Sequence, residues 1–135
     1  MIAAPTRLLL DTHILLWALL DSPRLGAPAR AMIADAGSEV LFSAVSVWEV
    51  AIKHALGRRD FPFRPERVAA QAAEDGYAEV PVTSGIASRV AYMPLHHRDP
   101  FDRLIVAQAL HLPARLLTAD PALRAYSSEL VVLAA

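Results

Sequence analysis

The sequence predicts an α/β fold: a three-layer α/β/α sandwich whose central sheet is mostly parallel. Short apolar runs alternate with longer segments of helical pattern along the whole chain, which is typical of strands joined by right-handed helical crossovers. The apolar runs also lack a regular polar alternation, as expected of strands that are covered on both faces. The length of 135 residues fits a single domain over residues 1–135.

The first half of the chain supplies two strands and three helices. "RLLL" at 7–10 and "EVLFS" at 39–43 are short apolar runs that predict buried strands. Helices are expected over 13–20, 28–37 and 46–57. We expect Gly37 and Gly57 to close the second and third of these helices, because glycine is common after a last helical turn, and Ser46 to open the third.

The second half continues the alternation. Helices are expected over 65–76, 84–93, 100–111 and 121–126, and Pro65 and Pro100 stand in the first turn, where proline is favoured. Strands are expected over 78–82, 114–118 and 129–133. In a parallel sheet of this kind ligands bind beyond the carboxyl ends of the strands, so residues that directly follow strands are the first candidates for a site.

The composition limits the class of protein. The absence of cysteine excludes disulfides and thiolate metal sites, and it fits a reducing, cytoplasmic setting. No apolar run reaches the roughly 20 residues of a membrane helix, and the first residues lack the order of a signal peptide. A net charge of −1 argues against a strongly basic nucleic-acid binder but allows a nuclease with a local acidic site. The hydrophobic content of 55% indicates that a partner covers part of the apolar surface.

Four of the fourteen acids stand in apolar surroundings, and each has a structural explanation as a helix cap. Asp11 follows "LLL" and precedes a helix, and Asp120 precedes a proline, so both are expected N-caps. Glu49 completes an S-x-x-E capping box with Ser46. In "DPFD" the first acid is the expected cap, and Asp102 lies near the positive end of the helix.

Taken together, the four acids indicate a metal site. All four fall at expected helix starts, and at least Asp11 and Asp120 also follow strands directly, so they project from one edge of a parallel sheet. If Glu49 and Asp102 fold onto that edge, four like charges meet and need compensation. A hard divalent cation with oxygen ligands supplies it, and carboxylates without cysteine favour Mg²⁺ or Mn²⁺ over zinc.

The motifs that carry these acids resemble those of PIN-domain ribonucleases, and in particular VapC-type toxins of toxin–antitoxin pairs. "LLLDTHILLWAL", "SAVSVWEVAIK", "DPFDRLIVAQA" and "LLTADPAL" stand in the order that the family shows, and the resemblance covers nearly the whole chain. It implies a PIN-like parallel α/β/α sandwich and Mg²⁺- or Mn²⁺-dependent cleavage of RNA. The metal-binding and catalytic acids that it implies are Asp11, Glu49, Asp102 and Asp120.

The resemblance also implies polar residues beside the acids. Thr12, Ser46 and Thr118 are candidates for contacts that orient the carboxylates or place water. Many relatives carry Asn where this chain has His13, so the polar contact that follows Asp11 differs here. His96 and His97 precede the acidic helix, but two adjacent histidines point in different directions on most backbones, and we assign them to a loop rather than to the metal.

Further candidate contacts are basic and aromatic. "GRRDFPFRPER" at 57–67 mixes arginines with two phenylalanines, which suits RNA, an antitoxin or simply an exposed connector, so Arg58, Arg59 and Phe61 are candidates for RNA or antitoxin contact. Arg103 stands next to Asp102 and can reach a phosphate, although a surface arginine is the favoured interpretation. Lys53 lies one turn after Glu49 and is expected to pair with it.

The resemblance implies partners as well: a VapB-like antitoxin whose tail buries apolar side chains in a groove, and a second copy of the chain in a homodimer. Two alternatives to a ribonuclease toxin stay open. The first is a non-catalytic binding module with the PIN fold. The second is a phosphatase with an aspartate nucleophile, which normally carries a second Asp two residues after the first, where this chain has His13.

Overall fold

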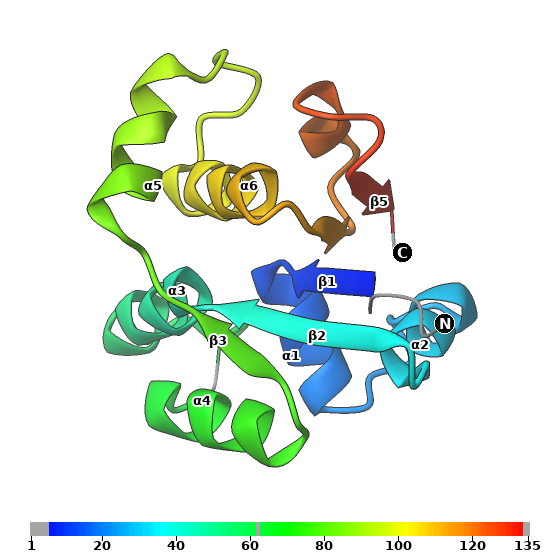
Figure 1. Ribbon diagram of the computed structural model, residues 1–135. Coiled ribbons are helices and arrows are strands. Elements are labelled where there is room, and N and C mark those ends of the chain that lie inside the picture. Colours follow the sequence, from blue (N-terminus) through cyan, green and yellow to red (C-terminus); the bar gives the residue numbers. More distant parts are fainter. Residues whose placement is uncertain (1–5, 62, 134–135) are drawn as a thin grey trace.

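The sheet has five parallel strands, and the order across it is β3-β2-β1-β4-β5 (Figure 1). This computed structural model describes residues 6–61 and 63–133. The strands are β1 (Thr6–Leu10), β2 (Ser38–Ser43), β3 (Ala78–Val80), β4 (Arg115–Thr118) and β5 (Val131–Leu133). The predicted fold class, a parallel α/β/α sandwich, is confirmed.

Helices lie on both faces of this sheet (Figure 1). The α-helices are α1 (Thr12–Leu19), α2 (Ala27–Ala34), α3 (Ala44–Ala55), α4 (Pro65–Glu74), α5 (Ser84–Arg89) and α6 (Pro100–His111), and the short 3-10 helices are η1 (Val90–Tyr92) and η2 (Pro121–Ala125). In β1, Leu8 and Leu10 pack toward α1, α2 and α4, whereas Leu9 packs toward α6 and η2. All three side chains are fully buried, which explains why β1 has no polar alternation.

The carboxyl ends of the three central strands meet at one edge of the sheet. Leu10 of β1 pairs with Phe42 of β2 on one side and with Leu117 of β4 on the other. The backbone N–H of Asp11 donates to the carbonyl of Leu117 at 3.0 Å, which extends the β1–β4 pairing by one residue. The next residues along the chain, Asp11, Ser43 and Thr118, therefore stand at this edge.

The start of α3 differs from the sequence prediction. The helix begins at Ala44, and the hydroxyl of Ser43 caps it by accepting from the N–H of Val45 at 2.9 Å. The predicted capping box of Ser46 and Glu49 is therefore wrong, because both residues lie inside the helix. Glu49 is a full turn away from the free N–H groups that a capping side chain would bind.

The two predicted glycine ends have different outcomes. Gly57 follows the last turn of α3 with a positive φ of 70°, a conformation that favours glycine, so this prediction is confirmed. Gly37 does not close α2, which ends at Ala34. The side chain of Asp35 accepts from the N–H of Gly37 at 2.8 Å, and this local turn leads into β2.

Several later elements are shorter than predicted, whereas α6 has the predicted bounds. β3 ends at Val80, because Pro81 has no N–H to extend the ladder. The helix expected over 84–93 divides into α5 and η1. Among the described residues, no helix is both long and apolar enough to cross a bilayer.

Candidate functional site

Asp11 links the ends of β1 and β4. One carboxylate oxygen accepts from the backbone N–H of Ile14 at 2.9 Å and caps α1, as predicted. The other oxygen accepts from the hydroxyl of Thr118. The same hydroxyl oxygen accepts from the N–H of Asp120 at 3.0 Å, so Thr118 connects two of the predicted acids. Asp11 is only 6% exposed, and its position is fixed from two directions.

Glu49 is held directly by two side chains, those of Thr12 and Lys53. It is 3% exposed in the middle of α3. Its Oε1 accepts from the Thr12 hydroxyl at 2.8 Å, and the Thr12 oxygen also lies 3.0 Å from the Ser46 hydroxyl. Its Oε2 forms the predicted ion pair with Lys53, one turn along the helix. Thr12 thus orients Glu49, whereas Ser46 contacts Thr12 and not the carboxylate itself.

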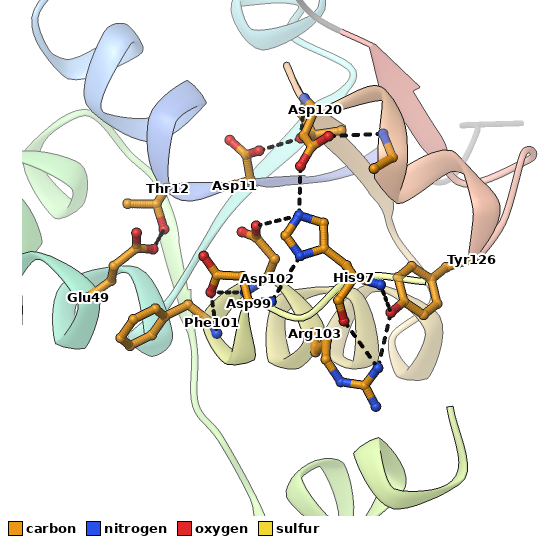
Figure 2. Close-up of polar contacts among 12 residues, drawn as sticks. Asp11, Thr12, Glu49, His97, Asp99, Phe101, Asp102, Arg103, Asp120 and Tyr126 are labelled. Carbon is orange, nitrogen blue, oxygen red and sulfur yellow. Dashed lines mark hydrogen bonds and ion pairs between the residues drawn. The ribbon is translucent and has the colours of Figure 1, made fainter. Parts of the chain in front are cut away.

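Asp102 and Asp120 approach one another around a histidine. Asp99 caps α6 by accepting from the N–H groups of Phe101 and Asp102, which places Asp102 in the first turn. Asp120 caps η2 by accepting from the N–H of Ala122 at 2.9 Å. His97 Nε2 lies 2.8 Å from Asp120 Oδ2 and 3.5 Å from Asp102 Oδ2. Figure 2 shows the imidazole between the two carboxylates, with Asp11 beside Asp120.

In the part of the chain that the structure describes, His97, Asp102 and Asp120 form a compact set of potential metal ligands, whose ligand atoms lie within 4.8 Å of one another. Sequence reasoning assigned His97 to a loop and missed its place in the site. Asp11 and Glu49 lie outside this compact set, although their charges reach it. Of the four predicted acids, Asp102 and Asp120 therefore lie closest together, and Asp11 and Glu49 lie beside this pair.

The pKa values show that the acids share one electrostatic environment. Burial raises the pKa of Asp11 to about 6, an effect that the hydrogen bonds from Thr118 and Ile14 oppose and the charges of Glu49 and Asp120 increase. Burial also raises the pKa of Asp102 to about 7, and the charges of Asp99 and Asp11 add to the shift. In both residues burial is the main cause of the raised pKa, and the neighbouring carboxylates add to it.

The donor set fits a hard divalent cation. Within residues 6–61 and 63–133, the Asp102 carboxylate accepts no hydrogen bond, and its one ion-pair contact is with His97 Nε2 at 3.5 Å. The other three predicted acids accept hydrogen bonds at both oxygens or pair with lysine. A partly buried carboxylate without hydrogen bonds is costly unless a cation or a proton compensates it. Oxygen ligands at the end of parallel strands suit Mg²⁺ or Mn²⁺.

Some of the predicted contact residues have structural roles instead. Phe61 is 1% exposed, so its ring is part of the core and is not presented to RNA or to an antitoxin. Arg58 pairs with Asp60 on the surface, and Arg59 lines a hollow of about 450 Å³ beside His13. His13 is exposed and packs against Phe61 and Trp17.

The side chain of Arg103 also forms hydrogen bonds within the protein. Its guanidinium donates to the carbonyls of Val90 and Pro94 at 3.0 and 3.1 Å and to the Tyr126 hydroxyl at 3.2 Å. It therefore fixes the loop before α6, and a direct phosphate contact would require these bonds to break.

Fold and site together define a parallel α/β protein with an acidic centre at the carboxyl edge of its sheet. The chain belongs to the PIN-domain family, whose model matches residues 8–129. No curated protein sequence matches it.

Three solved structures share the fold. The VapBC2 complex of Rickettsia felis, bound to promoter DNA, has a TM-score of 0.66 at 11% identity and covers 94% of this chain and 98% of its own. VapBC-1 of nontypeable Haemophilus influenzae has a TM-score of 0.63 at 17% identity, and FitAcB of Neisseria gonorrhoeae has 0.59 at 19%. Both cover 93% of this chain and 96% of their own.

The metal-free protein is expected to lose stability as pH rises. The pKa of Asp102 is about 7 in the folded state and 3.8 in the unfolded chain, so the folded state binds more protons between these values. The free energy of unfolding then falls between pH 4 and 7, and at 22% side-chain exposure we expect a loss of about 1–2 kcal/mol from this group. Thermal unfolding in EDTA at pH 5 and pH 8 measures it. Asp102→Asn should reduce the fall, and an equal fall in the variant would contradict this origin.

Proposed function

We propose that the chain is a Mg²⁺- or Mn²⁺-dependent endoribonuclease that acts as the toxin of a toxin–antitoxin pair. The observation that carries the proposal is the pair of carboxylates of Asp102 and Asp120, at the sheet edge where Asp11 and Glu49 also lie. Membership of the PIN-domain family supports a nuclease, and the similar folds of VapBC and FitAB complexes support a toxin. The absence of cysteine supports a place in the cytoplasm.

The proposed chemistry is hydrolysis of a phosphodiester. When bound, a divalent cation activates water for in-line attack and stabilises the charge that develops on the leaving oxygen. Asp102 and Asp120 would hold the cation most directly, and Asp11 and Glu49 would complete the acidic site, directly or through water. Thr118 and Thr12 keep the carboxylates of Asp11 and Glu49 in place. The expected products carry a 5′-phosphate and a 3′-hydroxyl.

Metal removal tests the proposal. Purified protein should cut RNA in Mg²⁺, lose that activity in excess EDTA and regain it when Mg²⁺ is restored. Asp11→Asn should lower the rate while it leaves the fold intact, because asparagine can still accept the hydrogen bond that caps α1. Cleavage at the wild-type rate in EDTA, or by the Asp11→Asn variant, would contradict the proposed role of the site. A folded protein that binds RNA without cutting it would favour the non-catalytic alternative.

The phosphatase alternative loses support from the position of His13. An aspartate-nucleophile phosphatase needs an acid two residues after the nucleophile. The residue there, His13, lies on the exposed side of α1 against Trp17 and Phe61 and takes no part in the contacts of Asp11.

An apolar hollow between α1 and α4 supports an antitoxin partner. Its volume is about 250 Å³, and its lining is apolar with a basic rim: Leu19, Leu20, Phe63, Val68, Arg64, Arg67 and Gln71. Leu20 is 59% exposed, which suits a surface that another chain covers. The basic rim would favour an acidic or amphipathic antitoxin segment.

Leu20→Asp should weaken binding of the antitoxin by at least about 10-fold, because it places a charge on the apolar contact. RNA cleavage by the free protein should stay near the wild-type rate. Calorimetric titration with the proposed VapB-like antitoxin measures the affinity. Unchanged affinity would place the antitoxin on another surface.

We propose that a second copy of the chain binds the apolar surface around Trp48. Trp48 is 52% exposed, and its ring packs edge-on against Phe101 with centroids 5.0 Å apart. Together with Val82 and Leu104 it lines a hollow of about 350 Å³. This face supports a homodimer, which sedimentation of the wild type would reveal.

A further inference from the structure

His97 holds a position in the candidate metal centre that the four acids alone do not explain. Its ring lies between Asp102 and Asp120, and its side chain is 21% exposed. A histidine in such a place is either a ligand of the cation or a donor that orients the ligands. The hydrogen bonds of its two ring nitrogens distinguish these roles.

The Nδ1 atom of His97 accepts a hydrogen bond. The backbone N–H of Asp99 points at it from 3.0 Å, and a backbone N–H can only donate. Nδ1 therefore carries the lone pair, and the ring hydrogen of the neutral imidazole lies on Nε2. Nε2–H then donates to Asp120 Oδ2 at 2.8 Å and lies 3.5 Å from Asp102 Oδ2. In this tautomer Nε2 has no lone pair to offer a metal.

The loop that carries His97 is locked in this orientation. The backbone N–H of His97 donates to the Tyr126 hydroxyl at 3.0 Å. Arg103 donates to the same hydroxyl and to the carbonyl of Pro94. The ring is thus positioned by α6, by the segment after η2 and by the cap of α6 itself, as expected of a group with an orienting role.

We infer that His97 is a positioning residue of the metal centre, which donates from Nε2–H to Asp120 and sets the spacing of Asp120 and Asp102 without binding the cation. Asp120 Oδ1 is already fixed by the N–H of Ala122, so the bond from His97 fixes its second oxygen. The two carboxylates are then held ready to bind one cation. This inference rests on the proposed metal-dependent function and assigns a residue that the acidic motifs do not include.

Removing the donor should weaken metal binding. Loss of an orienting partner typically lowers metal affinity by about 10–100-fold, so His97→Ala should raise the Kd for Mn²⁺ by that factor. His97→Gln should stay within a few-fold of the wild type, because its amide N–H₂ can reach the place of Nε2–H. His111→Ala, a histidine on the exposed far end of α6, is the matched control and should leave the Kd unchanged.

The experiment measures Mn²⁺ affinity by electron paramagnetic resonance of the free ion, and it then records the nitrogen couplings of Mn²⁺ bound to the wild type. The inference predicts no directly bonded histidine nitrogen. A directly bonded nitrogen would overturn it in favour of ligation, even if His97→Ala failed to fold. Wild-type Mn²⁺ affinity in a folded His97→Ala protein would also overturn the inference. If Asp102→Asn lost Mn²⁺ affinity in the same experiment, the proposed metal site itself would still be supported. A wild type that binds no Mn²⁺ would refute the proposed function and this inference together.

Discussion

Asp102→Asn is expected to lower metal-dependent RNA cleavage by more than about 100-fold. Loss of an orienting partner costs about 10–100-fold, and Asp102 is proposed to contact the cation itself, so its loss should cost more. Asparagine has nearly the same shape but no charge, and a neutral amide cannot replace a carboxylate as a ligand for Mg²⁺ at comparable strength. The cap of α6 is provided by Asp99, so the helix should keep its first turn.

The same variant should be at least as stable as the wild type without metal. Burial raises the pKa of Asp102 to about 7, so the ionised carboxylate destabilises the metal-free protein. Asparagine cannot ionise and removes this destabilisation. Asp75→Asn, on the exposed end of α4, is the control for an acid-to-amide change away from the site. Cleavage within a few-fold of the wild type by Asp102→Asn would contradict the role assigned to this acid.

Phe61→Ala is expected to destabilise the protein by about 3–5 kcal/mol, the usual cost of truncating a buried phenylalanine. The ring is 1% exposed in the core beneath α1 and α4. The Lys53 ammonium lies 4.3 Å from the centroid of the ring. Removing the ring would therefore also remove a contact of Lys53, which pairs with Glu49. Urea unfolding of the metal-free protein measures the change.

Phe63→Ala provides the matched comparison. Phe63 stands two residues further on and is only partly buried, at the rim of the hollow between α1 and α4. We expect it to cost less than half as much stability and to affect antitoxin binding more. A Phe61→Ala protein of wild-type stability with weakened RNA binding would show that Phe61 is a surface contact after all.

The sequence predicts the positions of two of the acids well, because their local role fixes where they lie in the fold. Asp11 and Asp120 cap helices, and a cap after a parallel strand necessarily lies at the carboxyl edge of the sheet. The capping interpretation of Asp11 and Asp120 is confirmed, and the same side chains belong to the proposed site. Glu49 is different, because Ser43 and not Glu49 caps the start of α3. The Glu49 carboxylate instead contacts Thr12 and Lys53.

His97 could not be predicted in the same way. Its place depends on a loop that crosses to the sheet edge, and the contacts that hold this loop come from Arg103 and from Tyr126, which is distant in sequence. Local pattern carries no information on such a contact. For the same reason the alternation of arginine and phenylalanine in 57–67 does not tell which ring faces the core. Phe61 is the fully buried ring, whereas Phe63 is only partly buried.

The end groups of cleaved RNA test the central claim most directly. If water is activated at Asp11, Glu49, Asp102 and Asp120 by a divalent cation, RNA cut by the wild type in Mg²⁺ should carry 5′-phosphate and 3′-hydroxyl ends, and a parallel reaction in EDTA should yield no cuts. Fragments that end in a 2′,3′-cyclic phosphate and form equally well in EDTA would show attack by the RNA's own 2′-hydroxyl, and would contradict the account.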